Sequence, residues 1–297
     1  MGQAGAVRSG AIVGLALVLA LAVACGGGGP EGGEGAGDRR VASPPGRESV
    51  PSGPSIVVGG DSVAASLVPA LTAAVGDRAR VDYLAAATIS TTSDRLAWAN
   101  GIEARDPDLV VVLVGPWEVL QPGFAPTEVG WASTYAERVL DPLAADLTAG
   151  GARVLWIEMH SATTTATTLS FAVLAAQVRE LAARRDDVDV LDSGAYVDRP
   201  GDVLADVLPG ADGAPERIRR LDGTGVHLCP AGVVRLATPV LHWLAAEAGE
   251  PDLVLPGWED AAWRVPPALP KPHECPPVSA TTTAPAGAAS APAGTAT

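Results

Sequence analysis

Short apolar runs alternate with longer amphipathic segments through the middle of the chain. The short runs predict strands at Ser55–Val58, Arg80–Leu84, Leu109–Val114, Val154–Glu158 and Val188–Leu191. The longer segments predict helices at Val63–Val75, Thr92–Ala104, Trp131–Ala149, Thr168–Arg185 and Ala231–Ala248. The unbroken run Leu109–Val114 is typical of a parallel strand that is covered on both faces. This alternation predicts an α/β domain in which a five-stranded parallel sheet lies between two layers of helices.

The N-terminal segment has the features of a secretory signal peptide. Arg8 precedes an almost wholly apolar stretch, Ala11–Ala24, whose length of about 14 residues is short of the roughly 20 that a membrane-spanning helix needs. The stretch ends in LAVAC, which resembles a bacterial lipobox, the motif whose cysteine is diacylated. We therefore expect residues 1–24 to be removed and Cys25 to hold the protein, by lipid alone, on the outer side of a bacterial cell membrane. Ordinary secretion and a short membrane anchor are the alternatives.

Composition divides the remainder of the chain. Residues 25–54 are rich in Gly, Pro and Ser, which predicts a flexible tether, and the uncharged residues 276–297 predict a disordered Ala/Thr/Pro tail. Residues 55–275, between them, suit one domain. In an exported chain Cys229 and Cys275 predict a disulfide, with two free thiols as the alternative. The histidines are scattered without ligand spacing, so we expect no metal and no cofactor.

Charge excludes one class of partner. The chain has 20 basic and 34 acidic residues and a net charge of −14. A nucleic-acid binder needs a basic surface to neutralise phosphates, and docking on an anionic lipid surface needs one as well. We therefore expect no nucleic acid among the partners. We expect a monomer.

Residues that suit nucleophilic catalysis follow the predicted strands. Ligands bind such sheets at the carboxyl ends of the strands. There the chain carries G-G-D-S, ending at Ser62, and before the last helix it carries D-G-T-G-V-H, from Asp222 to His227. A serine becomes a nucleophile when a base takes its proton and an acid orients the base, and Ser62, His227 and Asp222 could fill these roles. A helix N-cap at Ser62 and a structural loop histidine are the competing interpretations.

G-D-S after the first strand, together with D-G-x-G-V-H before the last helix, makes the chain resemble the SGNH (GDSL-type) hydrolases. DLVVVLVGPWEV and GVHLCPAG resemble most the SGNH domains linked to actinobacterial acyltransferases. The resemblance implies a flavodoxin-like three-layer sandwich, with Ser62 as the nucleophile and His227 as the general base. The family's acid stands three positions before the histidine, where this chain has Thr224. Asp222 is our candidate for that role, and a Ser/His dyad or Glu158 are the alternatives.

The oxyanion hole of the family uses the serine N–H, a glycine N–H after the second strand and an asparagine after the third. In this chain Thr88 lies near the glycine position and Trp117 stands at the asparagine position, two residues after Gly115. These three residues are our oxyanion or substrate-binding candidates, because an indole N–H also donates a hydrogen bond. His160 follows the fourth predicted strand, and we expect it to be a solvated loop residue.

The resemblance implies a serine esterase or deacylase that forms an acyl-enzyme on Ser62. With the predicted anchor, we expect an exported enzyme that acts on small acyl esters or on acylated glycans of the cell envelope. An O-acyltransferase of the same fold is one alternative. A catalytically degenerate domain that binds a glycan or a partner protein is another, since the usual asparagine, glycine and aspartate are missing.

Overall fold

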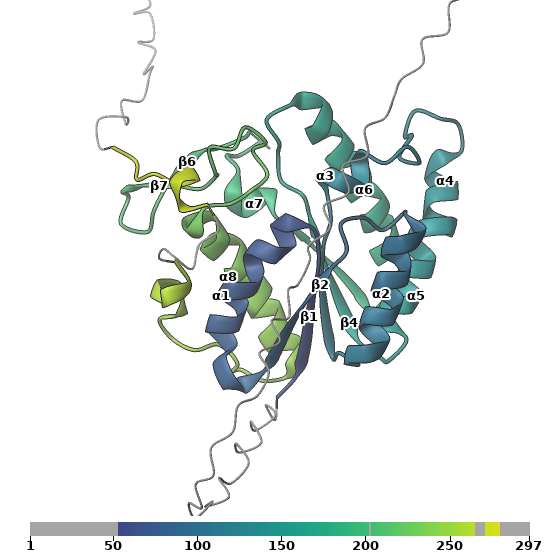
Figure 1. The fold of residues 1–297 in the computed structure, drawn as a ribbon, viewed down its shortest axis with the longest axis horizontal. Helices are drawn as coiled ribbons and strands as arrows, with labels where there is room; N and C mark the ends of the chain where they lie inside the picture. Colours follow the sequence, from purple (N-terminus) through teal and green to yellow (C-terminus); the bar gives the residue numbers. More distant parts are fainter. Residues whose placement is uncertain (1–52, 202, 265–270, 280–297) are drawn as a thin grey trace, which may run out of the picture. The chain divides into compact units, whose positions relative to one another are not determined.

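The computed structural model describes residues 53–201, 203–264 and 271–279. The predicted signal peptide, Cys25, almost all of the predicted tether and most of the predicted tail lie outside these residues. Within the described residues the backbone alternates between strands and helices as the hydrophobic pattern predicts (Figure 1).

The central sheet consists of parallel strands only. The strands are β1 (Ser55–Gly60), β2 (Arg80–Ala85), β3 (Leu109–Leu113), β4 (Arg153–Glu158) and β5 (Val188–Asp192), in the order β2-β1-β3-β4-β5. This is the flavodoxin-like order, so the predicted fold class is confirmed. The last residue of β1, Gly60, pairs with Ala85 of β2 and with Leu113 of β3. The chain therefore changes direction across the sheet at β1, and ligand sites form beyond the carboxyl end of such a strand.

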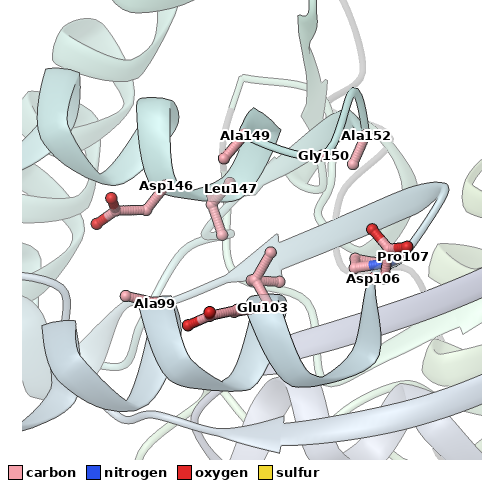
Figure 2. Close-up of a pocket in the computed structure, with 10 residues that line it drawn as sticks. Ala99, Glu103, Asp106, Pro107, Asp146, Leu147, Ala149, Gly150 and Ala152 are labelled. Carbon is pink, nitrogen blue, oxygen red and sulfur yellow. The ribbon is translucent and has the colours of Figure 1, made fainter.

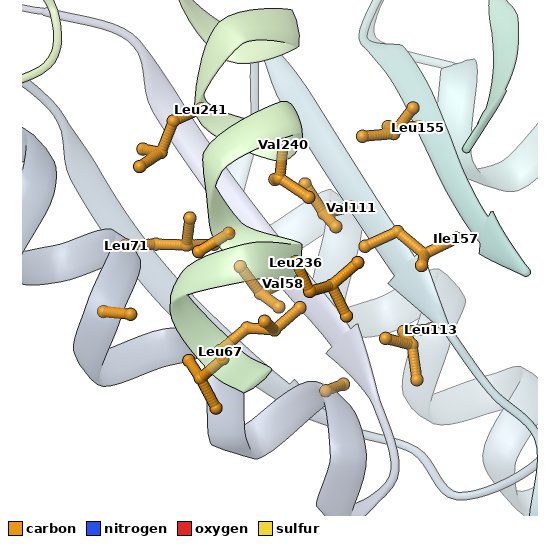
Figure 3. Packing of buried hydrophobic residues seen from close by; sticks show 14 of the residues in the cluster. Val58, Leu67, Leu71, Val111, Leu113, Leu155, Ile157, Leu236, Val240 and Leu241 are labelled. Atoms are coloured by element: carbon orange, nitrogen blue, oxygen red, sulfur yellow. The ribbon is translucent and has the colours of Figure 1, made fainter. Parts of the chain in front are cut away.

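Helices cover both faces of the sheet. The longer ones are α1 (Ser62–Val75), α2 (Thr92–Arg105), α5 (Asp141–Thr148), α6 (Thr165–Ala182) and α8 (Pro230–Ala248). Side chains alternate along each strand, so Val58 faces α1 and α8 while its neighbour Val57 faces the layer of α2, α5 and α6. Figure 3 shows the first of these cores, in which Leu67 of α1 and Leu236 of α8 pack near Val58. Burial of both faces explains why the interior strands β1, β3 and β4 are largely apolar.

The predicted helix Trp131–Ala149 is a composite in the structure. It consists of α4 (Trp131–Tyr135), a π-helical turn (Ala136–Leu140) and α5. Pro142, in the first turn of α5, has no N–H to donate to Arg138 O. The side chain of Arg95, on α2, donates to that carbonyl instead, with 3.0 Å between Nη1 and O. The irregular turn is therefore stabilised by a tertiary contact that sequence periodicity does not show.

Several short elements were not predicted. They are α3 (Pro116–Val119), α7 (Gly194–Val197), an antiparallel pair of β6 (Val207–Pro209) and β7 (Pro215–Arg217), and 3₁₀ turns at Gly76–Arg78, Trp258–Asp260, Ala262–Arg264 and Pro272–Glu274. Cys229, just before α8, forms the predicted disulfide with Cys275. Among the described helices, none combines the length and the apolar character that crossing a membrane requires.

Candidate active site

Ser62 lies at the carboxyl end of β1, where the chain turns sharply into α1. Gly60 has φ +143°, and a Cβ placed on it would lie 1.9 Å from Leu113 O, so only glycine fits between β1 and β3. Asp61 caps α1, because its Oδ1 accepts a hydrogen bond of 2.8 Å from Val63 N. The first residue of the helix is Ser62, and its side chain is exposed at the edge of the sheet. Asp61, rather than Ser62, is therefore the helix cap.

The loop before α8 brings an imidazole to this serine. His227 Nε2 lies 2.8 Å from Ser62 Oγ, and His227 Nδ1 lies 2.5 Å from Asp222 Oδ2. Since an ionised carboxylate only accepts, Nδ1 carries the ring proton and Nε2 is left with a lone pair facing the serine hydroxyl. The structure thus places Ser62, His227 and Asp222 in one chain of hydrogen bonds.

Asp222 is held in its ionised form by its own loop. Its Oδ1 accepts hydrogen bonds from the backbone N and the hydroxyl of Thr224, at 2.9 and 2.8 Å. Partial burial tends to raise the pKa of Asp222, but these hydrogen bonds and the contact with His227 outweigh it and leave the pKa below its usual value. Thr224, which stands where the family has its acid, supports a carboxylate two positions earlier in the chain. Positive φ angles at Gly223 and Gly225 allow that tight loop.

Glu158, an alternative acid from the sequence, is not next to His227 in the structure. It accepts from Arg179 Nε at 2.6 Å, and its side chain is almost fully buried at the end of β4. Burial raises the pKa of this carboxyl group against the opposing effect of the Arg179 guanidinium. Glu158 is accounted for by that ion pair.

The three oxyanion candidates lie in different environments. Thr88 is buried, and both its backbone N and its hydroxyl donate to Asp94 Oδ2, at 2.7 and 2.8 Å. Thr88 therefore offers neither group to a substrate, contrary to our expectation. Gly115 precedes α3, and a Cβ there would lie 2.3 Å from Met159 Cγ, so the glycine permits close packing. Trp117 is 56% exposed on α3, which makes its ring available to a ligand.

Glu118 is a buried residue that sequence reasoning missed. It is 0% exposed, and its Oε2 accepts from the backbone N of Ile89 at 2.8 Å and of Ser90 at 3.3 Å. Its Oε1 accepts from the Tyr135 hydroxyl at 2.6 Å, and burial, followed by this carboxylate, raises the pKa of Tyr135. Glu118 thus ties the segment after β2 to α3. A lone acid in the apolar context GPWEVL was the available signal.

His160 is not the solvated loop residue that we expected. Its side chain is 2% exposed, and Nε2 lies 2.9 Å from Val226 O, one residue before His227. Val226, from the Asp222–His227 loop, and Ser193, just before α7, lie next to its two ring nitrogens. Among the described residues, no group of three or more His, Cys, Asp or Glu side chains is arranged to hold a metal ion.

An opening between α2 and α5 is not part of this site. Figure 2 shows the cavity, of about 400 Å³, with Asp106, Pro107 and Ala152 in its lining. These residues immediately precede β3 and β4, so the cavity lies at the amino edge of the sheet. Ser62 lies at the opposite edge.

A Ser-His-Asp arrangement at the carboxyl edge of a flavodoxin-like sheet is the site geometry of a serine hydrolase. Residues 55–243 match the family described as "Protein of unknown function (DUF459)", and the chain belongs to that family. No curated protein sequence is detectably similar to the chain.

Solved structures with a similar backbone include a hydrolase, an esterase and the catalytic domain of an acetyltransferase. The α/β hydrolase LAE5, from the metagenome of Lake Arreo in Spain, is 18% identical, with 67% of this chain and 96% of that chain covered and a TM-score of 0.47. A mutant of the acetylxylan esterase Axe2 from Geobacillus stearothermophilus is 17% identical, with 67% and 95% covered and a TM-score of 0.44. The catalytic domain of peptidoglycan O-acetyltransferase A from Streptococcus pneumoniae is 18% identical, with 67% and 95% covered and a TM-score of 0.43.

The flavodoxin-like fold that the resemblance to the SGNH hydrolases implied is confirmed by the order of the strands. What the similar proteins act on does not carry over at these identities. The disposition of Ser62, His227 and Asp222 is therefore the basis for any assignment of activity.

Proposed function

We propose that this protein is a serine esterase that cleaves acyl esters through an acyl-enzyme on Ser62. The observation that carries the proposal is the hydrogen-bond chain from Ser62 Oγ through His227 to Asp222, with links of 2.8 and 2.5 Å. Each link lies within the distance that proton transfer requires, and the tautomer leaves the lone pair of Nε2 on the serine side.

The reaction follows from this geometry. Ser62 Oγ bonds to the acyl carbon while His227 Nε2 takes the hydroxyl proton, and Asp222 stabilises the imidazolium. His227 then gives that proton to the oxygen of the departing alcohol as the ester bond breaks. Water enters, His227 removes its proton, and hydroxide attack releases the carboxylic acid and restores Ser62. The proton of Ser62 leaves on the alcohol, and the proton that His227 takes from water passes to Ser62 Oγ as the acyl-enzyme bond breaks. The ester and one water molecule are therefore the only reagents consumed.

The N-terminus of α1 supplies a donor for the developing oxyanion. The backbone N of Ser62 belongs to the first turn of a 14-residue helix, where N–H groups and the helix dipole favour negative charge. The indole N–H of exposed Trp117 is the second donor that we propose, in place of the family's asparagine.

We also propose that the enzyme is exported, anchored by lipid at Cys25, and acts on acylated glycans of the cell envelope. The apolar stretch ending in LAVAC supports export and anchoring. The exposed ring of Trp117, close in sequence to the end of β3, supports a sugar-bearing substrate, since an aromatic face suits the apolar face of a sugar ring. The exposed ring of Trp117 also favours a second candidate function, in which the acyl group is transferred to a sugar hydroxyl and not to water.

Labelling by a fluorophosphonate, which reacts with activated serines, tests the esterase assignment. We expect wild-type protein to be labelled at Ser62, and Ser62→Ala and His227→Ala to remain unlabelled while folded. Ser66→Ala is the matched control, because Ser66 lies on the same helix and its hydroxyl donates to Val63 O at 2.6 Å.

Hydrolysis of short acyl esters should follow the same pattern across these variants. An acylated product that appears when a glycan acceptor is added would assign the transferase instead. Folded, disulfide-bonded wild type that shows neither labelling nor turnover would contradict both and leave a glycan-binding or protein-binding domain.

A further inference from the structure

The loop that carries Asp222 and His227 is held through its carbonyl oxygens by residues outside it. Thr163 N donates to Thr224 O at 3.1 Å. Arg219 Nη1 donates to Gly225 O, and His160 Nε2 donates to Val226 O at 2.9 Å. These are the carbonyls of the three residues immediately before His227, so each of those residues is held by a hydrogen bond from outside the loop.

His160 is suited to this task because it stays neutral with one defined tautomer. Val226 O can only accept, so the ring proton lies on Nε2. Burial, with a smaller effect from the Arg219 charge, lowers the pKa of His160 to about 3. On its other side, His160 Nδ1 lies 3.3 Å from Ser193 Oγ, and that hydroxyl donates to Glu158 O. Because that hydroxyl gives its one proton to Glu158 O and Nδ1 carries none, the hydrogen bond of the imidazole is the one from Nε2. It joins His160, two residues after β4, to the residue before His227.

Arg219 contacts the same loop from a fully buried position. Its exposed fraction is 0%, and its charge is paired with Asp198. Besides Gly225 O, its guanidinium donates to Ser161 O and to Ala205 O, both at 3.1 Å. Asp198 in turn accepts from Ser161 N at 2.9 Å. Most of these partners are backbone groups from separate loops, which the one guanidinium joins together.

A buried ion pair is weak evidence for stability, since apolar residues of similar volume often stabilise as much. What such a pair provides instead is a fixed set of hydrogen-bond directions. Gly225, whose carbonyl accepts from Arg219, also lies close to Thr163. Its φ is +74°, and a Cβ placed on it would lie 2.8 Å from Thr163 Oγ1 and 2.9 Å from Thr163 N. The Asp222–His227 loop therefore packs directly on the segment that follows β4.

We propose that His160 and Arg219 are positioning residues that set the distance and orientation of His227 relative to Ser62. This inference rests on the proposed function for its kinetic consequence, though not for its structural one. Neither residue touches the reacting atoms: His160 acts through Val226 O and Arg219 acts through Gly225 O. Displacing a catalytic group by about 1 Å can lower a rate about 10²-fold. Loss of either backbone contact should therefore lower the rate at Ser62 measurably.

The test compares two substitutions at one position. His160→Phe keeps an aromatic ring and removes the donor to Val226 O, whereas His160→Gln keeps an N–H close to the position of Nε2. Trp263→Phe is the matched control: it also removes a ring N–H bonded to a backbone carbonyl, Trp258 O at 2.8 Å, on a segment that packs against α1. Thermal unfolding of all three variants reports the purely structural cost.

Two readouts separate positioning from folding. The first is the far-downfield proton NMR signal expected for His227 Nδ1–H shared with Asp222. The second is the rate of fluorophosphonate labelling at Ser62. We expect His160→Phe to lose the signal and to label about 10²-fold more slowly. His160→Gln should keep the signal with a rate within a few-fold of wild type, and Trp263→Phe should match wild type in both.

A His160→Phe variant that is folded and retains both the signal and the labelling rate overturns the proposal. If wild type shows the signal but never labels, the proposed function fails while the signal still decides the role of His160. If His160→Phe does not fold, Arg219→Lys replaces it, since lysine keeps the charge opposite Asp198 but lacks the planar fork. Loss of the signal in that folded variant supports the proposal, and an unchanged signal overturns it.

Discussion

The buried His160 predicts that the protein loses stability as the pH falls from 7 to 5. In the folded state burial lowers the pKa of this imidazole from 6.5 to about 3, so it stays neutral over that range. In the unfolded chain the same group titrates near 6.5. Between these two values the unfolded state binds more protons, and stability therefore rises with pH. The contribution is present above pH 6.5 and is progressively lost as the pH falls toward 3.

The magnitude follows from the difference between the two pKa values. One unit of pKa corresponds to about 1.4 kcal/mol, so protonation of the unfolded chain at His160 removes about 2 kcal/mol between pH 7 and pH 5. Lowering the pH further to 4 brings the total loss from this group to about 3 kcal/mol. Losses of this size are a large part of the stability of an ordinary domain.

Urea unfolding at pH 7, 6 and 5 measures the effect. His160→Gln keeps a donor for Val226 O but does not titrate, so the difference between wild type and this variant isolates the histidine from other titrating groups. We expect that difference to change by about 2 kcal/mol over the range, in favour of the variant at low pH. His242→Gln, at an exposed position on α8, is the control and should run parallel to wild type. Parallel wild-type and His160→Gln curves would show that His160 binds its proton equally well in the folded and unfolded states.

Three further predictions concern residues around the site. Asp222→Asn presents an amide N–H to His227 Nδ1 and so favours the wrong tautomer; the rate of labelling at Ser62 should fall about 10⁴-fold. Thr224→Val leaves the carboxylate in place and should lower that rate far less, and equal losses in the two variants would contradict the assignment of Asp222. Replacing Cys229 and Cys275 by serine opens a loop with a sequence separation of 46; denaturant unfolding should show a loss of about 4 kcal/mol, and reductant should reproduce that loss in wild type but not in the variant. Glu118→Gln removes a charged acceptor from Ile89 N and the Tyr135 hydroxyl. Denaturant unfolding should show that it lowers the free energy of unfolding by about 1–3 kcal/mol, more than Tyr135→Phe does. A larger loss in Tyr135→Phe would show that the hydroxyl, rather than the backbone contacts, stabilises the fold.

The fold could be predicted because both faces of the sheet are buried. The interior strands then read as apolar runs such as Leu109–Val114, and the helices as longer periodic segments. The composite helix at residues 131–148 was predicted only as helical. Its π turn depends on Pro142 and on a contact from Arg95, a residue far away in sequence. The short elements α3, α7, β6 and β7 contain too few residues for a periodic pattern to emerge.

Several buried polar residues could not be predicted from the sequence. Arg219 stands in RIRRLDG, which is typical of a solvated basic turn, and His160 follows a strand as exposed loop residues do. Both are buried because their hydrogen-bonding partners are mostly backbone groups from distant loops. Backbone groups have the same chemistry at every position, so no residue type marks them in advance.

The order of residues along the chain is enough to predict that Ser62 and His227 meet at the edge of the sheet. A serine just after the first strand and a histidine shortly before the last helix come together in any compact sheet of this order, because β1 is an interior strand and α8 packs on the same face as α1. Tertiary structure alone decided which acid orients His227. Asp222, Glu158 and a dyad without an acid were all compatible with the sequence, and the choice depends on a loop bent at two glycines of positive φ and held through successive carbonyls. Such a conformation arises from packing between segments far apart in the chain, which local sequence does not encode.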